Sequence, residues 1–215
     1  MSFYEHGKTE DYLLELLGNS APSGPSDVRR DAEKFGVPIV SDTGAQLLRI
    51  VTRMVRPRRI LEIGTAIGYS GLIMLLNSDA CLYTVDFDEA ALDKARKNFA
   101  KYGMSGRVRI LSGDVSDVVP MIEGSFDLIF LDGPKGRYHE LLPHLVRLLP
   151  EGGTLLCDNV LYSGRMSGER EVPPEKRTIY DRLELFMRDV TSDPRLITSV
   201  LPVGDGMSLS VRKPI

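Results

Sequence analysis

The sequence predicts an α/β fold in which a doubly wound, mostly parallel sheet ends in an antiparallel C-terminal hairpin. From Arg59 onward, short continuous apolar runs alternate with segments of helical periodicity. This alternation is typical of parallel strands buried beneath helices on both faces. Near the C-terminus, only the short link 202–206 separates the last two strand-like runs, so they can pair only as antiparallel neighbours.

The first part of the chain is predicted to be helical. One amphipathic pattern lies near residues 8–17. A second begins after Pro25 and ends at Gly36, and a third begins at Ser41 and stops before Pro57. Cap residues and breakers at these positions are the usual signals of helix ends.

The rest of the chain is predicted to alternate between strands and helices. The expected strands are Ile60–Ile63, Cys81–Val85, Val108–Leu111, Leu128–Leu131, Thr154–Cys157, Leu196–Leu201 and Met207–Val211. The expected helices are Tyr69–Leu76, Glu89–Lys101, a short turn or helix ending at Pro120, His139–Leu149 and about 176–190.

The length of 215 residues favours a single domain over residues 1–215, with residues 1–40 as an N-terminal helical extension. Hydrophobic residues make up 42% and charged residues 27% of the chain, as in ordinary soluble proteins. The formal net charge of −3 lacks the basic excess of proteins that bind mainly through phosphates.

The cysteines and the N-terminal residues bear on the cellular compartment of the protein. Cys81 and Cys157 both fall in strand-like apolar runs, so we expect buried free thiols in a reducing environment. The N-terminal residues are polar and lack the apolar core of a signal peptide. No apolar stretch reaches the ~18 residues that a membrane span needs. We therefore expect a cytoplasmic protein with no membrane partner.

A glycine-rich turn follows the first strand. Gly64 and Gly68 have the spacing G-x-x-x-G, which differs from the G-x-G-x-x-G of the dinucleotide fingerprint. Glu62 places a carboxylate at the strand end, where it would repel a pyrophosphate and attract a cationic amino-acid group. The alternative is a glycine-rich turn with no ligand.

Acidic residues also follow the second and third strands. Asp86 lies where a carboxylate accepts hydrogen bonds from ribose hydroxyls in sheets of this kind. Asp88 is expected to cap the next helix. Gly113, Asp114 and Val115 follow the third strand, and Asp114 fits equally well beside a nucleobase or as a helix cap.

Oxygen-bearing side chains gather after the fourth and fifth strands. Asp132 follows the fourth, and Asp158 and Asn159 follow the fifth. Either aspartate alone could be a helix cap, but together with the amide they form a ligand set that suits a hard cation such as Mg²⁺. The charged segment 164–176 fits a solvated loop or a lid over a substrate.

These motifs together resemble the metal-dependent class I O-methyltransferases, which include catechol and caffeoyl-CoA O-methyltransferases and small bacterial relatives. The match starts at about Val40 and rests on LEIGTAIGYS, the acidic end of TVDFD, FLDGPKGRY, LLCDNVLYSGR and GDGMSLSVRK. The resemblance implies a Rossmann-like, seven-stranded sheet with S-adenosyl-L-methionine (SAM) as methyl donor. It also implies Mg²⁺, or another divalent cation such as Mn²⁺ or Ca²⁺, and a homodimer.

The resemblance further implies a role for each matched residue. Glu62 would hold the amino group of SAM, Asp86 would bind the ribose, and Lys135 occupies the position of the family's catalytic lysine. Asp205, in the last motif, receives no role. The implied cofactor-binding residues are Val40, Glu62, Gly64, Ser70, Asp86, Gly113, Asp114, Val115 and Asp132, the metal ligands are Asp132, Asp158 and Asn159, and the catalytic residues are Lys135 and Asp132.

The sequence therefore predicts an enzyme that moves a methyl group from SAM to a metal-coordinated hydroxyl of a small aromatic, catechol-like substrate. The alternative acceptor is a hydroxyuridine in tRNA, which some bacterial members of the family modify. An NAD(P)-dependent oxidoreductase fits less well because the dinucleotide fingerprint is missing. A non-enzymatic SAM-binding subunit would need neither the metal ligands nor Lys135.

Overall fold

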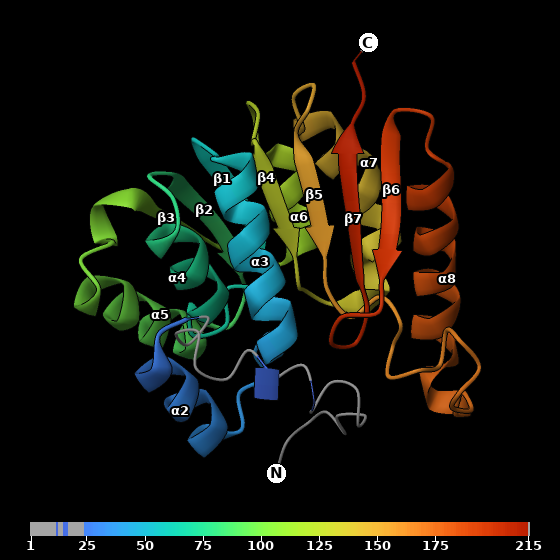
Figure 1. The fold of residues 1–215 in the computed structure, drawn as a ribbon, viewed down its shortest axis with the longest axis horizontal. Coiled ribbons are helices and arrows are strands. Elements are labelled where there is room, and N and C mark those ends of the chain that lie inside the picture. Colours follow the sequence, from blue (N-terminus) through green and yellow to red (C-terminus); the bar gives the residue numbers. More distant parts are fainter. Residues whose placement is uncertain (1–11, 13–14, 17–23, 215) are drawn as a thin grey trace.

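The computed structural model describes residues 12, 15–16 and 24–214. Over these residues the chain forms one seven-stranded sheet with helices on both faces (Figure 1). The predicted helix near residues 8–17 lies largely outside the described residues. The strands are β1 (Arg59–Ile63), β2 (Cys81–Asp86), β3 (Val108–Ser112), β4 (Leu128–Leu131), β5 (Thr154–Cys157), β6 (Leu196–Leu201) and β7 (Met207–Arg212).

The sheet has the strand order β3-β2-β1-β4-β5-β7-β6. The first five strands pair in parallel, whereas β7 is antiparallel to both β5 and β6. This confirms the predicted parallel sheet with an antiparallel C-terminal hairpin. The strand order reverses between β1 and β4, and in sheets of this kind ligands bind beyond the carboxyl ends of the strands at that point.

Helices cover the two faces in separate groups. With α2 beneath them, α3, α4 and α5 pack on one face, and α6, α7 and α8 pack on the other (Figure 1). The helices are α2 (Ser26–Phe35), α3 (Asp42–Val55), α4 (Tyr69–Leu76), α5 (Glu89–Lys101), α6 (Val115–Met121), α7 (Tyr138–Leu148) and α8 (Arg177–Ser192), with short 3₁₀ turns at Ser105–Arg107, Lys135–Arg137 and Pro174–Lys176.

Alternate strand residues supply the two cores. In β1, Ile60 packs beneath the α3–α4–α5 group, while Leu61 and Ile63 pack against the opposite group. Successive side chains of a strand point to opposite faces, so continuous apolar strands are needed wherever both faces are covered. Glu62 shares the face of Ile60 and is a buried charged residue in this otherwise apolar strand.

The predicted helix ends are confirmed. The hydroxyl of Ser41 accepts a hydrogen bond from the Gly44 N–H at the start of α3, at 3.2 Å. Gly36 ends α2 in the left-handed conformation, with φ of 65°. Asp88 accepts from the N–H groups of Ala90 and Ala91 at the start of α5. These caps satisfy backbone groups that the helix itself leaves unpaired.

One prediction about the cysteines is wrong. Both are free, and Cys157 is buried as expected, but Cys81 is exposed. Cys81 is the first residue of β2 and lies at the amino edge of the sheet. Its apolar neighbours in the sequence occupy the covered middle of the strand, so their burial does not extend to the strand's first side chain.

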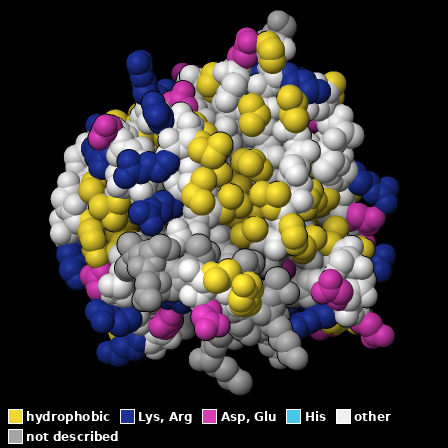
Figure 2. Space-filling view, viewed as in Figure 1, with side chains coloured by type: hydrophobic (Ala, Val, Ile, Leu, Met, Phe, Trp, Pro, Cys, Tyr) yellow, Lys and Arg dark blue, Asp and Glu magenta, His cyan; other side chains and the backbone are white. Residues whose placement is uncertain are grey.

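An apolar surface remains on the face that carries α3 and the β7–β6 end of the sheet. Figure 2 shows hydrophobic side chains gathered in the middle of this view. Ile50 and Met54 of α3 and Ile197 and Val211 of the terminal strands are exposed. Ile197 pairs with Val211 in the β6–β7 register, so the two lie on one side of the sheet. We call these four residues the apolar face.

No helix among the described residues is long and apolar enough to cross a membrane.

Candidate functional site

A cavity of about 300 Å³ opens at the carboxyl ends of β1, β2 and β4, where the strand order reverses. Backbone and side chains from both halves of the sheet form its walls. It is lined by Pro38, Ile39, Val40, Gly64, Thr65, Ala66, Tyr69, Ser70, Val85, Asp86, Phe87, Val115, Asp132, Gly133, Pro134, Lys135 and Asn159.

The turn after β1 brings the two halves of the cavity together. The N–H of Gly64 donates to Val85 O of β2, while the N–H of Asp132 donates to Ile63 O of β1. Gly64 has φ of 101°, and a Cβ at this position would overlap the carbonyl oxygen of Asp132. Glycine is therefore required here both for backbone conformation and for close contact between the β1 and β4 ends.

Asp86 holds this turn from β2. Its Oδ2 accepts from the N–H of Ala66 at 2.8 Å, and its Oδ1 accepts from the N–H groups of Phe87 and Asp88 at 2.8 and 3.1 Å. Its carboxylate therefore lies in the cavity wall in a fixed orientation. A carboxylate held in this way can accept further hydrogen bonds from ligand hydroxyls, because each oxygen has two lone pairs.

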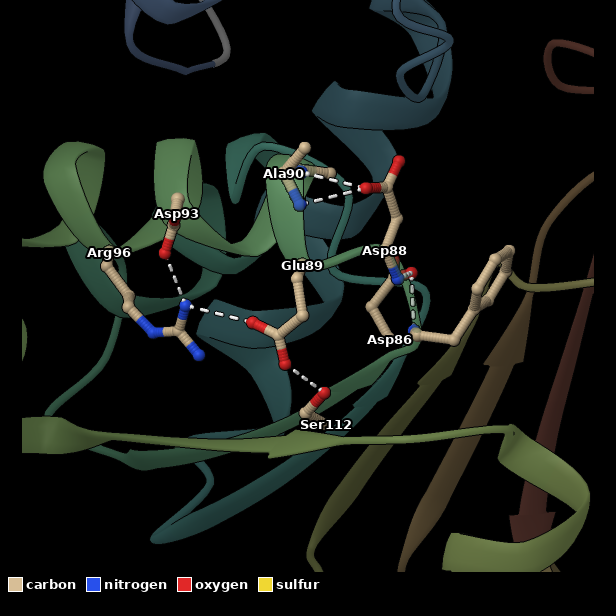
Figure 3. A network of polar contacts seen from close by, with 9 residues as sticks. Asp86, Asp88, Glu89, Ala90, Asp93, Arg96 and Ser112 are labelled. Atoms are coloured by element: carbon tan, nitrogen blue, oxygen red, sulfur yellow. Dashed lines mark hydrogen bonds and ion pairs between the residues drawn. The ribbon is translucent and has the colours of Figure 1, made fainter.

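Polar contacts also join the start of α5 to the end of β3 (Figure 3). Glu89 accepts from the hydroxyl of Ser112 and pairs with Arg96, which also pairs with Asp93. The Ser112 hydroxyl and then the Arg96 contact hold the pKa of Glu89 below its usual value. This network therefore holds the start of α5, which follows Asp86, against the end of β3, which precedes the β3–α6 turn.

The residues of the β3–α6 turn lie partly in the cavity wall and partly beside it. Asp114 accepts from the N–H of Ser116 at 2.8 Å and so is the N-cap of α6. Val115 lines the cavity, whereas Gly113 and Asp114 are not among its lining residues. The predicted helix cap is thus observed, and the contact of Asp114 with a nucleobase stays a prediction.

Glu62 lies one layer below the cavity. Its side chain is 0% exposed, and its two carboxylate oxygens accept from the hydroxyls of Ser70 and Thr84, both at 2.6 Å. The Thr65 hydroxyl lies 2.6 Å from that of Thr84. Because Thr84 donates to Glu62, Thr65 must be the donor to Thr84. Two chains of hydroxyls thus connect Glu62 to the cavity-lining residues Ser70 and Thr65.

Burial decides the protonation of Glu62. The loss of water raises its pKa to about 7, although the Ser70 and Thr84 hydrogen bonds favour the charged form. The charges of Asp132 and Asp86 act in the same direction as burial and contribute to this raised pKa. Glu62 therefore changes its ionisation near neutral pH unless a cationic group binds close to it.

Asp132, Asp158, Asn159 and Lys135 meet at the ends of β4 and β5. Asp158 is 2% and Asn159 5% exposed, while Asp132 is half-buried in the cavity wall. Lys135 Nζ donates to Asn159 Oδ1 at 2.9 Å, and the N–H of Asn159 donates to Asp158 Oδ1 at 2.6 Å. Asn159 has φ of 59°, a left-handed conformation that asparagine tolerates better than most residues.

Asp132 and Asp158 bring two carboxyl groups together, and Lys135 is the cation that acts on both. Burial, followed by the charge of Asp132, raises the pKa of Asp158 well above its usual value. Burial likewise raises the pKa of Asp132, and Lys135 opposes that shift. A bound divalent cation would offset the cost of burying both charges, so the residues fit such an ion. Within the described residues, no three His, Cys, Asp or Glu side chains gather in metal-binding geometry, so the candidate set is two carboxylates and an amide.

The predicted site residues occupy different layers of this site. Glu62 and Asp158 lie beneath the cavity surface, and Gly113 and Asp114 lie beside it. Those that line the cavity are Val40, Gly64, Ser70, Asp86, Val115, Asp132, Lys135 and Asn159.

Several lining residues were not predicted. Pro38 and Ile39 precede Val40, Phe87 follows Asp86, and Thr65 lies inside the glycine-rich turn. Their sequence positions beside predicted residues are the signal that could have identified them. The full set of lining residues absent from the prediction is Pro38, Ile39, Thr65, Ala66, Tyr69, Val85, Phe87, Gly133 and Pro134.

Comparison with known proteins identifies the family. The family model for O-methyltransferases matches residues 28–213. The chain belongs to the O-methyltransferase family. It is 27% identical to the catechol O-methyltransferase of Niastella koreensis over 213 residues, which cover 95% of this chain and 96% of that protein.

Solved structures of methyltransferases share this O-methyltransferase's fold. The SAH-bound methyltransferase of Podospora anserina aligns with a TM-score of 0.82 and 25% identity, covering 100% of both chains. The O-methyltransferase of Bacillus cereus in complex with SAH aligns with a TM-score of 0.79 and 23% identity, covering 95% of this chain and 97% of that one. The latter similarity concerns the fold.

The buried position of Glu62 generates a testable pH dependence. Because its pKa in the folded state is raised from 4.5 to about 7, folding favours the protonated form. This contribution to stability is fully present below about pH 4.5 and is lost as pH rises through about 7. Between these limits, the wild type should lose about 3 kcal/mol of unfolding free energy relative to Glu62→Gln, which cannot ionise.

Urea denaturation of the ligand-free protein at a series of pH values measures this difference. The exposed Glu151 provides a matched control, since Glu151→Gln should follow the wild-type curve. Parallel curves for the wild type and Glu62→Gln would show that Glu62 does not titrate as its burial requires.

Proposed function

We propose that this O-methyltransferase binds SAM in the cavity at the β1–β4 switch point and transfers its methyl group to the hydroxyl of a small aromatic, catechol-like substrate. We call Asp132, Lys135, Asp158 and Asn159, at the ends of β4 and β5, the acid–amide cluster. One observation carries the proposal: three of these residues, Asp132, Lys135 and Asn159, also line the cavity. A methyl donor in the cavity and a hydroxyl at the cluster would therefore be close neighbours.

The cavity's polar groups support the choice of cofactor. Asp86 would accept hydrogen bonds from the ribose hydroxyls, and Val115 would contact the adenine. Ser70 would bind the amino-acid end of SAM, with Glu62 beneath it providing negative charge that complements the ammonium and sulfonium groups. Val40 would close the cavity over the methionine portion. The SAH-bound methyltransferase of Podospora anserina is consistent with this assignment.

We propose that Asp132, Asp158 and Asn159 hold a divalent cation, with Mg²⁺ the first candidate. Their oxygen donors match the preference of hard cations. When bound, such a cation would lower the pKa of the acceptor's hydroxyl and fix its position. The two carboxylates would balance the charge of a divalent cation, and the neutral amide of Asn159, unlike a third carboxylate, would add no negative charge.

The chain's own residues would then supply alignment and proton transfer. The cavity walls hold donor and acceptor so that oxygen, methyl carbon and sulfur lie in line. As the O–C bond forms, the C–S bond breaks and S-adenosylhomocysteine (SAH) leaves as a neutral thioether. Lys135, as the free amine, would accept the hydroxyl proton at Nζ. Its present hydrogen bond to Asn159 places it at this edge of the cavity.

Titration calorimetry with SAH and with Mg²⁺ tests the cofactor and the metal. We expect saturable heat for each ligand with the wild type. Asp158→Asn removes one buried carboxylate, so it should lose the Mg²⁺ heat while keeping SAH binding. The exposed Asp79 provides the control, since Asp79→Asn should bind both ligands normally. Absence of SAH binding would contradict the proposed cofactor, and unchanged Mg²⁺ binding in Asp158→Asn would contradict the metal site.

Replacing Lys135 tests the proton acceptor. Lys135→Met keeps much of the side chain's length but removes the amine, so turnover should fall roughly 10²–10⁴-fold, the range for loss of a general base. SAH affinity should change little. Methyl transfer from labelled SAM is measured with a panel of catechols and, separately, with hydroxyuridine-containing tRNA, so that the two acceptor classes are compared directly. The control is exposed Lys97→Met, and equal turnover in both variants would remove Lys135 from the mechanism.

We also propose a homodimer, which would bury the apolar face. Light scattering after size-exclusion chromatography should give the mass of two chains. Ile197, 63% exposed at the sheet edge, is the residue to change, and Ile197→Asp should shift the protein towards monomer. Leu185 is similarly exposed on α8, away from the apolar face, so Leu185→Asp is the control. A monomeric wild type would contradict the proposal.

A further inference from the structure

The turn between β6 and β7 lies between two walls of the site. On one side, the N–H groups of Val160 and Leu161 donate to the carbonyls of Gly206 and Asp205, at 3.0 and 2.9 Å. On the other side, a Cβ on Gly204 would overlap the hydroxyl of Ser41. The turn thus contacts both the segment that follows Asn159 and the residue that follows Val40.

The segment 159–164 has a backbone that needs outside support. Asn159, Tyr162 and Ser163 have φ values of 59°, 51° and 55°. Residues other than glycine rarely adopt this left-handed backbone conformation. Where they do, the surrounding structure usually holds them in it. Besides the two backbone hydrogen bonds from Val160 and Leu161, the Asp205 side chain supports this segment, because its Oδ1 accepts a hydrogen bond from the N–H of Ser163.

Asp205 also acts on the charges of the site. Burial raises the pKa of its carboxyl, while the charges of Lys135, Arg165 and Arg170 favour the ionised form. The Asp205 charge in turn contributes to the raised pKa of Asp158. The carboxylate is therefore close enough to the acid–amide cluster to influence it, although it does not line the cavity.

We propose that Asp205 is a positioning residue for the acceptor side of the site. By holding Ser163, and through it the segment 159–164, it keeps Asn159 oriented toward Lys135 and the proposed cation. The part that concerns the cation rests on the proposed function. The part that concerns the segment 159–164 rests on the hydrogen bonds alone.

Two variants of Asp205 and one control separate these parts. Asp205→Ala removes the acceptor for the Ser163 N–H, whereas Asp205→Asn retains an oxygen there and removes only the charge. The control is Asp193→Ala. Asp193 caps a turn by accepting from the N–H of Arg195 at 2.8 Å, and this turn precedes β6 at the end of the sheet opposite the site.

Two readouts are measured on the full chain. The first is the rate of tryptic cleavage after Arg165 in the ligand-free protein, which reports opening of the segment. The second is Mg²⁺ affinity by calorimetry. For Asp205→Ala we expect cleavage roughly five-fold or more faster, because one hydrogen bond that opposes opening is lost. We expect Mg²⁺ affinity about 10-fold or more weaker, as for groups that orient metal ligands.

The other variants define the limits of the proposal. Asp205→Asn should be cleaved nearly as slowly as the wild type, and Asp193→Ala should match the wild type in both readouts. Unchanged cleavage in Asp205→Ala, or equally fast cleavage in Asp193→Ala or Asp205→Asn, would overturn the positioning role. A wild type that takes up no Mg²⁺ would instead contradict the proposed metal site, while faster cleavage of Asp205→Ala would still support the hold on segment 159–164.

Discussion

The close pairing of β1 with β4 is the constraint on which the site depends. These strands are neighbours in space, yet β2 and β3 lie between them in the sequence. At their carboxyl ends, Gly64 lies against the Asp132 backbone with no room for a side chain. Because of this contact, the turn that would bind the cofactor and the acidic edge that would bind the acceptor share one cavity.

Burial of charge is the main cost of this arrangement. Glu62 lies beneath the cavity on one side, and Asp132 and Asp158 lie beside each other on the other. In the ligand-free chain, Lys135 opposes the raised pKa values of the two aspartates. The proposed ligands, a sulfonium cofactor and a divalent cation, are both cations. Binding would therefore relieve electrostatic cost that folding alone leaves in place.

Backbone contacts between distant segments hold the polar groups in orientation. Asp86, at the end of β2, accepts the N–H of Ala66 in the β1–α4 turn, and the β6–β7 turn accepts three N–H groups from the segment after Asn159. Such contacts keep side chains in place before any ligand arrives, which lowers the entropic cost of binding. They also explain why residues outside the cavity, such as Asp205, belong to the functional unit.

The sequence by itself determined the order of strands and helices, the antiparallel hairpin and eight of the 17 cavity-lining residues. These follow from local periodicity, cap residues and the rule that strand ends share an edge. Tertiary structure alone decided which layer each residue occupies: Glu62 lies beneath Ser70, Asp114 caps a helix, and Cys81 is exposed. Burial and hydrogen-bond partners depend on chain segments far apart in sequence, and local pattern does not carry that information.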